Sequence, residues 1–184
     1  MQLYARVASL IFGITMLLLS VAVTVETLIR KLFSISLGGV DELAGYAIAI
    51  GAPVAFAVTL IDQSHIRINM FYAKVPPKGQ AVLNALAALS LGVLAVFLLI
   101  FTYDTVTLTQ TYRSIAQTPW ATPLIYPQAA WLFAMAVFAV PAVWLMGRAI
   151  LLLILGNWKA LNSEFSPESV EDELESELED FGNR

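Results

Sequence analysis

The sequence predicts an all-α integral membrane protein with four transmembrane helices and both termini in the cytoplasm. The first observation is composition, because 59% of the 184 residues are hydrophobic and only 13% are charged, outside the range of ordinary soluble domains. The second is that the hydrophobic residues form long runs, each near the ~20 residues that a helix needs to cross the hydrocarbon layer. The third is that these runs lack the alternation of β-barrel strands. Inside the membrane their backbone N–H and C=O groups must therefore be paired within helices.

The predicted spans are residues 7–29, 43–61, 82–103 and 129–155. We interpret the first as a retained anchor, because its uncharged stretch is longer than the apolar core of a usual signal peptide. Basic residues near span ends favour the cytoplasm. They are more frequent on the side of the termini (Arg6, Arg67, Lys74, Lys78, Lys159) than on the other side (Arg30, Lys31, Arg113). This excess predicts the orientation given above.

The chain divides into a four-helix membrane domain, residues 1–160, and an acidic cytoplasmic tail, residues 161–184. The net charge of -4 reflects the tail, where most of the 14 acidic residues lie. We interpret the tail as solvated, with many carboxylates that repel one another. The alternative is a helix that docks on a basic partner through an apolar stripe made of Val170, Leu174, Leu178 and Phe181.

The second span is rich in glycine and alanine. Gly45 and Ala49 have the small-xxx-small spacing that lets helix backbones approach closely in membranes, which makes both residues candidates for a subunit interface. Pro53 removes a backbone hydrogen bond near the middle of this span, so we expect a kink or a local repair there.

Glu26 is the only acidic residue well inside a predicted span. One interpretation is a proton-coupled acid, as in a small four-helix multidrug exporter. The other is an ion pair with Arg30, four residues later on the same helix and close to the membrane boundary. We favour the ion pair, because a proton-coupled site is expected near the middle of the membrane.

Asp41 and Glu42 follow two glycines and precede the second span, where carboxylates cap a helix and oppose its dipole. One carboxylate suffices as a cap, which leaves the other for a lysine or arginine of a partner. His65 and Arg67 close the same span, in a segment suited either to a headgroup or subunit contact or to a plain surface loop. With one histidine and no cysteine, haem and zinc sites are improbable, and we predict no cofactor or metal.

Pro119, Trp120 and Pro123 lie in a short segment before the fourth span. Aromatic residues there suit a belt at headgroup depth, while the prolines impose a rigid turn that could serve as a docking surface. The sequence contains no catalytic triad, phosphate-binding loop or basic-aromatic stripe, so we predict neither an enzyme nor a nucleic-acid-binding protein.

The stretch from Asp41 to Pro76 resembles the small membrane subunit (DctQ type) of tripartite ATP-independent periplasmic (TRAP) transporters, where an acidic residue opens the second span and a His-Ile-Arg element closes it. Gln117-Thr118-Pro119 is similar to the Thr/Ser-Pro segment of that family. Two features depart from the family pattern: Asn69 stands where an acidic residue is common, and the motif does not predict the acidic tail.

The resemblance implies a subunit of a sodium-coupled, binding-protein-dependent importer of an organic anion, a carboxylate or a sialic-acid-like solute. The implied partners are a large permease subunit that binds the solute, a periplasmic solute-binding protein, and membrane lipid. By the same resemblance Asp41, Glu42, His65 and Arg67 are structural or inter-subunit residues, and Trp120 belongs to the outer docking surface. The chain itself would be a scaffold without a solute site.

Overall fold

The computed structural model describes residues 2–61, 72 and 74–166, with side chains for residue 10 and from residue 12 onward. Within these ranges the helices are α1 Gln2–Phe33, α2 Val40–Ile61, α4 Pro77–Tyr112, α5 Ile125–Ile154 and α6 Trp158–Phe165. The first four are long and apolar enough to cross a membrane. The predicted all-α class with four spans is therefore confirmed. His65 and Arg67 lie outside the described residues.

The long helices extend beyond most of the ends predicted from hydropathy. The predicted span 82–103, for example, is the middle of the 36-residue α4. Hydropathy detects only the part of a helix that suits lipid, whereas the helical backbone hydrogen bonds continue to the residue that terminates the helix. Pro77 begins α4, where a missing N–H costs no hydrogen bond. Arg113 ends it in the left-handed conformation at φ 50°, with its N–H donating to the Thr109 carbonyl.

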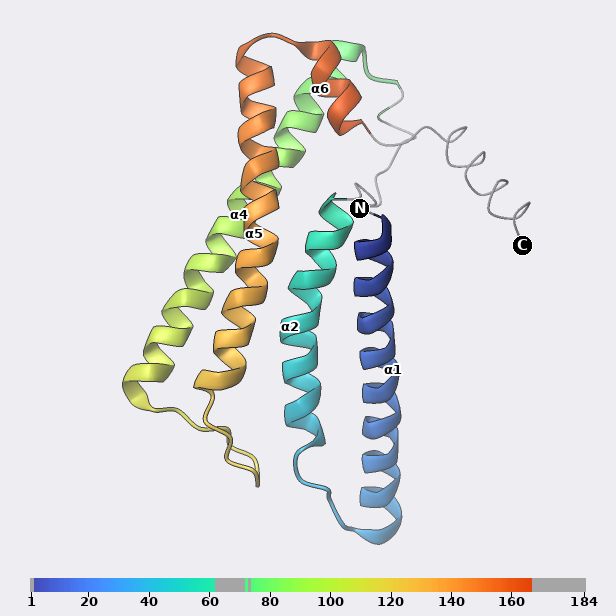
Figure 1. The fold of residues 1–184 in the computed structure, drawn as a ribbon, viewed down its shortest axis with the longest axis vertical. Coiled ribbons are helices and arrows are strands. Elements are labelled where there is room, and N and C mark those ends of the chain that lie inside the picture. The colour runs from blue at the N-terminus through green and yellow to red at the C-terminus, as the bar shows by residue number, and fades with distance from the viewer. Residues whose placement is uncertain (1, 62–71, 73, 167–184) are drawn as a thin grey trace, which may run out of the picture.

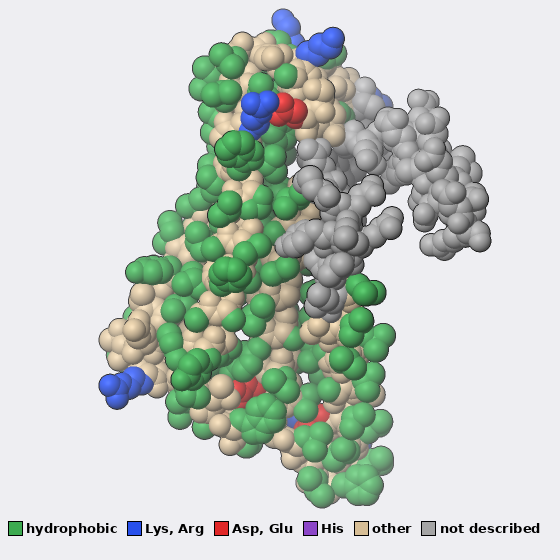
Figure 2. Space-filling view, viewed as in Figure 1, with side chains coloured by type: hydrophobic (Ala, Val, Ile, Leu, Met, Phe, Trp, Pro, Cys, Tyr) green, Lys and Arg blue, Asp and Glu red, His purple; other side chains and the backbone are tan. Residues whose placement is uncertain are grey.

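The four long helices form an open row in the order α1, α2, α5, α4, and not a closed bundle. The main helix contacts are α4 with α5, α2 with α5, and α1 with α2 (Figure 1). Helix α1 stands at one end of the row, next to α2. Most of its described apolar side chains, such as Leu17 and Leu32, are exposed. On the face that Figure 2 shows, the described side chains along the row are mainly hydrophobic, and charged groups gather towards its ends. Both flanks therefore suit lipid or another apolar protein surface.

Close helix contacts depend on glycines, but not on the one that the sequence pattern indicated. A Cβ at Gly51 of α2 would lie 2.6 Å from Cε2 of Phe12, so Gly51 lets α1 approach α2. A Cβ at Gly45 would meet nothing within 4 Å, and Gly45 is exposed. Gly45 is therefore not at a close helix contact among the described residues, and its contact with another subunit stays a prediction. A similar close approach joins α4 to α5, where Gly92 packs against Met146.

Helix α6 folds back onto the ends of α4 and α5. Asn157 caps it by accepting a hydrogen bond from the Ala160 N–H at 3.2 Å. Leu161 and Phe165 are buried in a cluster with residues of α4 and α5. The predicted boundary between residues 160 and 161 falls inside this helix, because an apolar stripe at 161 and 165 outweighs the polar composition around it.

A polar network fixes α6 to the start of α4. The buried Asn84 amide donates to the Tyr72 hydroxyl at 2.8 Å and to Asn162 Oδ1 at 3.3 Å. Asn162 in turn donates to the Pro77 carbonyl at 2.9 Å. The Tyr72 and Ser166 hydroxyls are 2.8 Å apart. Since buried polar groups must be paired, this network specifies one docked position for α6.

Candidate functional site at the loop end of the row

Two connections meet at the end of the row opposite α6. The α1–α2 connection is residues 34–39 and the α4–α5 connection is residues 113–124 (Figure 1). We call these segments, together with the first turn of α2, the loop platform. They are distant in sequence, and side-chain contacts hold them together.

The α4–α5 connection is a short hairpin. The Ala116 N–H donates to the Thr122 carbonyl at 2.9 Å, and the Leu124 N–H donates to the Ser114 carbonyl at 3.1 Å. Ile115 and Pro123 form an isolated antiparallel bridge between its two arms. Pro123, predicted as a docking residue, thus stands in an arm of the hairpin and is exposed.

The tip of this hairpin is a β-turn that presents Pro119 and Trp120. The Ala121 N–H donates to the Thr118 carbonyl at 3.0 Å, which closes the turn. Proline suits the first central position because its ring fixes φ, and Ala121 takes a left-handed φ of 48°. The Trp120 side chain is projected from the turn, and the residue remains 52% exposed.

The turn is seated on the two glycines before α2. A Cβ on Gly39 would lie 2.2 Å from Cε2 of Trp120, so only glycine lets the indole lie against the backbone there. A Cβ on Gly38 would lie 3.2 Å from Cγ of Pro119, and Gly38 has a left-handed φ of 77°. The Pro119-Trp120 turn therefore packs directly against the backbone of Gly38 and Gly39.

Glu42 joins the two connections from the first turn of α2. Its carboxylate accepts hydrogen bonds from the Thr118 hydroxyl and from the Tyr46 hydroxyl, the latter at 2.6 Å. The side chain is buried. Glu42, which the sequence made an interface candidate, is thus engaged within the chain, and its contact with another subunit stays a prediction.

Glu26 holds the α1–α2 connection against α1. Its Oε1 accepts from the Ser36 hydroxyl at 2.7 Å and from Arg30 Nη2 and Nε at 2.7 and 3.1 Å. Its Oε2 accepts from the Leu37 N–H at 2.8 Å. The residue is 2% exposed. The ion pair with Arg30 is thus present. The same carboxylate also binds Ser36 and Leu37 and so fixes the α1–α2 connection, which disfavours a role for Glu26 as the proton-coupled acid of an exporter.

Asp41 is the carboxylate that faces outward. Its Oδ2 lies 3.2 Å from Nη2 of Arg30, and its side chain is 74% exposed. Arg30 thereby bridges the end of α1 to the start of α2. Of the two acidic residues that precede the second span, Asp41 is the one whose carboxylate is accessible to a partner.

Sequence reasoning identified most of the polar residues here but missed how they meet. The contacts of Glu42 with Thr118 and of Gly39 with Trp120 join residues that are 76 and 81 positions apart in the sequence. The sequence feature that could have indicated these contacts is a Gly-Gly turn and a Pro-Trp turn predicted at the same end of the helices. Ser36 carried no pattern that would have singled it out.

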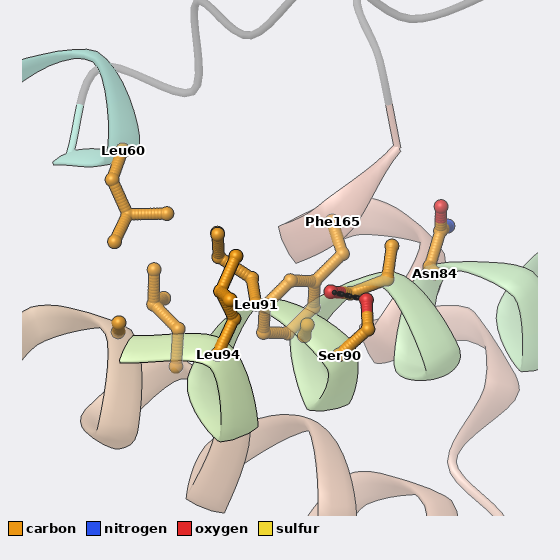
Figure 3. A pocket seen from close by; sticks show the side chains of 10 residues that line it. Leu60, Asn84, Ser90, Leu91, Leu94 and Phe165 are labelled. Atoms are coloured by element: carbon orange, nitrogen blue, oxygen red, sulfur yellow. Dashed lines mark hydrogen bonds between the residues drawn. The ribbon is translucent and has the colours of Figure 1, made fainter. Parts of the chain in front are cut away.

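A cavity of about 350 Å³ lies towards the α6 end and is lined mainly by apolar side chains, including Leu60, Leu91 and Leu94 (Figure 3). The Ser90 hydroxyl at its wall donates to the Ala87 carbonyl at 2.9 Å. The Asn84 amide nitrogen, also at the wall, donates to Tyr72 and Asn162. These polar groups are committed to the chain itself, so the lining is poorly suited to a hydrated organic anion.

The comparisons with known proteins agree with this arrangement. No curated protein matches the chain at a significant level. The family model described as "Tripartite ATP-independent periplasmic transporters, DctQ component" matches residues 19–152, a range that includes the later part of α1, all of α2, α4 and the loop platform, and most of α5. The chain therefore belongs to the DctQ family, the small membrane component of TRAP transporters.

Proposed function

We propose that the chain is the small permease subunit of a sodium-coupled, binding-protein-dependent TRAP transporter that imports an organic anion, such as a carboxylate or a sialic-acid-like solute. It scaffolds the large permease subunit and contributes part of the surface on which the periplasmic solute-binding protein docks. The observation that carries this proposal is the loop platform, a rigid polar structure built at one end of a row of helices with apolar flanks.

The open row supports the scaffold role. A closed four-helix bundle buries its apolar residues among its own helices, whereas here α1 contacts chiefly α2 and leaves most of its surface for other molecules. Membrane helices associate through close packing of small residues. Gly45 of α2 faces open space, and together with Ala49 one turn later it suits a contact with a helix of the large permease subunit.

The platform supports the docking role. We place it on the periplasmic side, and place α6 and both termini in the cytoplasm of a bacterial inner membrane, in accordance with the basic residues near the span ends. Trp120 is held by Gly39 and still exposes half of its surface. Rigid, partly exposed aromatic residues are frequent anchors in protein interfaces, because little side-chain entropy is lost on binding.

The test replaces Trp120 with alanine and measures solute uptake into proteoliposomes that contain both membrane subunits, as a function of binding-protein concentration. We expect the concentration for half-maximal uptake to rise about ten-fold, while co-purification with the large subunit is unchanged. Phe133→Ala is the matched control, because Phe133 is also exposed but lies within α5, outside the loop platform. An unchanged half-maximal concentration in Trp120→Ala would contradict the docking role.

A further inference from the structure

An apolar groove runs between α4 and α5 on a flank of the row. Its volume is about 650 Å³, and its walls include Val96, Leu99, Val140, Val143, Gly147 and Leu151. The lining also contains one charged residue, Arg148, which lies towards the α6 end. Arg148 pairs with Glu164 of α6, but this ion pair alone does not explain why the arginine borders an apolar groove.

Within the part of the chain that the structure describes, the Arg148 guanidinium has donors that its ion pair does not use. Its Nε donates to Glu164 Oε2 at 3.1 Å, and its Nη2 donates to Glu164 Oε1 at 2.8 Å. A guanidinium carries five N–H donors, so the ion pair leaves Nη1 and one N–H of Nη2 for another acceptor. The Arg148 side chain is 46% exposed, which makes these donors accessible. Glu164 therefore orients the guanidinium without saturating it.

The depth of the groove matches one leaflet of a membrane. Arg148 stands six residues before α5 ends at Ile154, or ~9 Å along the axis, which suits a side chain that reaches headgroup level. From Arg148 to Ala139, the first α5 residue of the groove, is nine residues or ~13 Å. Half of the hydrocarbon layer is ~15 Å thick. The cation and the apolar walls thus lie where the phosphate and acyl chain of one lipid would lie.

We propose that this groove binds an anionic phospholipid from the leaflet on the α6 side, with its phosphate on Arg148 and an acyl chain along Val143 and Gly147. The charge of the groove matches that of the headgroup, since arginine donors bind phosphate oxygens strongly. A helix of another subunit would continue past Arg148 and would not use its remaining donors. Apart from Leu151, the walls named above lie on the side of Arg148 that faces the middle of the membrane, which is the order of phosphate and acyl chain in a lipid.

Native mass spectrometry of the full-length, delipidated chain tests the proposal with phosphatidylglycerol and, for comparison, zwitterionic phosphatidylcholine. We expect one tightly bound phosphatidylglycerol, held about ten-fold more strongly than phosphatidylcholine. Arg148→Gln should reduce its affinity to that of phosphatidylcholine. Arg113→Gln, which removes a charge at the opposite end of α4, is the matched control and should leave the preference intact.

A second variant fills the groove and keeps the ion pair. A Cβ at Gly147 meets nothing within 4 Å, so Gly147→Leu adds a side chain to the groove without a clash in the chain. We expect it to weaken phosphatidylglycerol binding about ten-fold. Gly45→Leu is the steric control, since Gly45 is also open but lies on α2. It should have no effect.

Three outcomes would overturn the proposal. Equal binding of both lipids by the unaltered chain would make the groove a non-selective apolar surface. Displacement of phosphatidylglycerol by millimolar inorganic phosphate would make Arg148 a site for free anions. Loss of the bound lipid when the chain assembles with the large permease subunit would mean that the groove is part of the interface with that subunit.

Discussion

At the scale of single residues, the loop platform depends on a glycine that has no alternative. We expect Gly39→Ala to destabilise the chain by about 1–3 kcal/mol, because the new Cβ would overlap the Trp120 ring and displace the turn. Thermal unfolding in detergent measures the change. Gly45→Ala is the matched control, because its Cβ meets nothing within 4 Å. Equal stability of the two variants would show that Trp120 does not rest on Gly39.

Glu26 distinguishes a structural acid from a transport acid. Glu26→Gln keeps the shape of the side chain but removes the charge that binds Arg30 and Ser36, so we expect a loss of about 1.5–3 kcal/mol in unfolding free energy. Asp41→Asn, at an exposed ion pair, should cost about 0–1 kcal/mol. Drug resistance of cells that express the chain should be the same for all three proteins. Resistance that requires Glu26 would instead support an exporter.

At the scale of elements, α6 was the part that sequence patterns did not predict. Its eight residues are too few for a hydropathy signal, and its docking depends on Leu161, Phe165 and a polar network assembled from three segments. The four long helices were predictable because lipid imposes length and hydrophobicity on each of them separately. Their order in the row was not, since it depends on which glycines permit close approach.

The docking of α6 should depend on pH through Glu164, which lies beyond the last span. Hydrogen bonds from the Arg148 guanidinium, with its positive charge, lower the pKa of Glu164. A carboxyl whose pKa is lower in the folded protein adds stability above its unfolded pKa, about 4.3, and loses it as the pH falls through the folded value. We expect α6 to open more readily at acidic pH.

Hydrogen exchange of the α6 amides between pH 7 and pH 3, corrected for intrinsic exchange rates, measures this opening. The unaltered chain should lose protection over the acidic part of that range. Glu164→Gln should start with less protection and lose little more, because the titrating group is absent. Equal pH dependence in both proteins would mean that the ion pair with Arg148 does not hold α6 in place.

At the scale of the whole molecule, the polar chemistry of the described residues lies at the two ends of the row and its flanks are apolar. The sequence predicted most of this distribution, because few charged residues other than Glu26 and Arg148 lie inside the predicted spans. It also identified Glu26, Asp41, Glu42 and Trp120. It could not predict their contacts, which join the start of α2 to the α4–α5 connection and exist only once the helices are side by side.

The central claim is that the chain supports transport without performing it alone. Solute uptake into proteoliposomes, driven by a sodium gradient and supplied with the binding protein, tests it most directly. We predict uptake only when this chain and the large permease subunit are reconstituted together, and background levels with either one alone. Full uptake by the large subunit without this chain, or any gradient-driven uptake by this chain alone, would contradict the account.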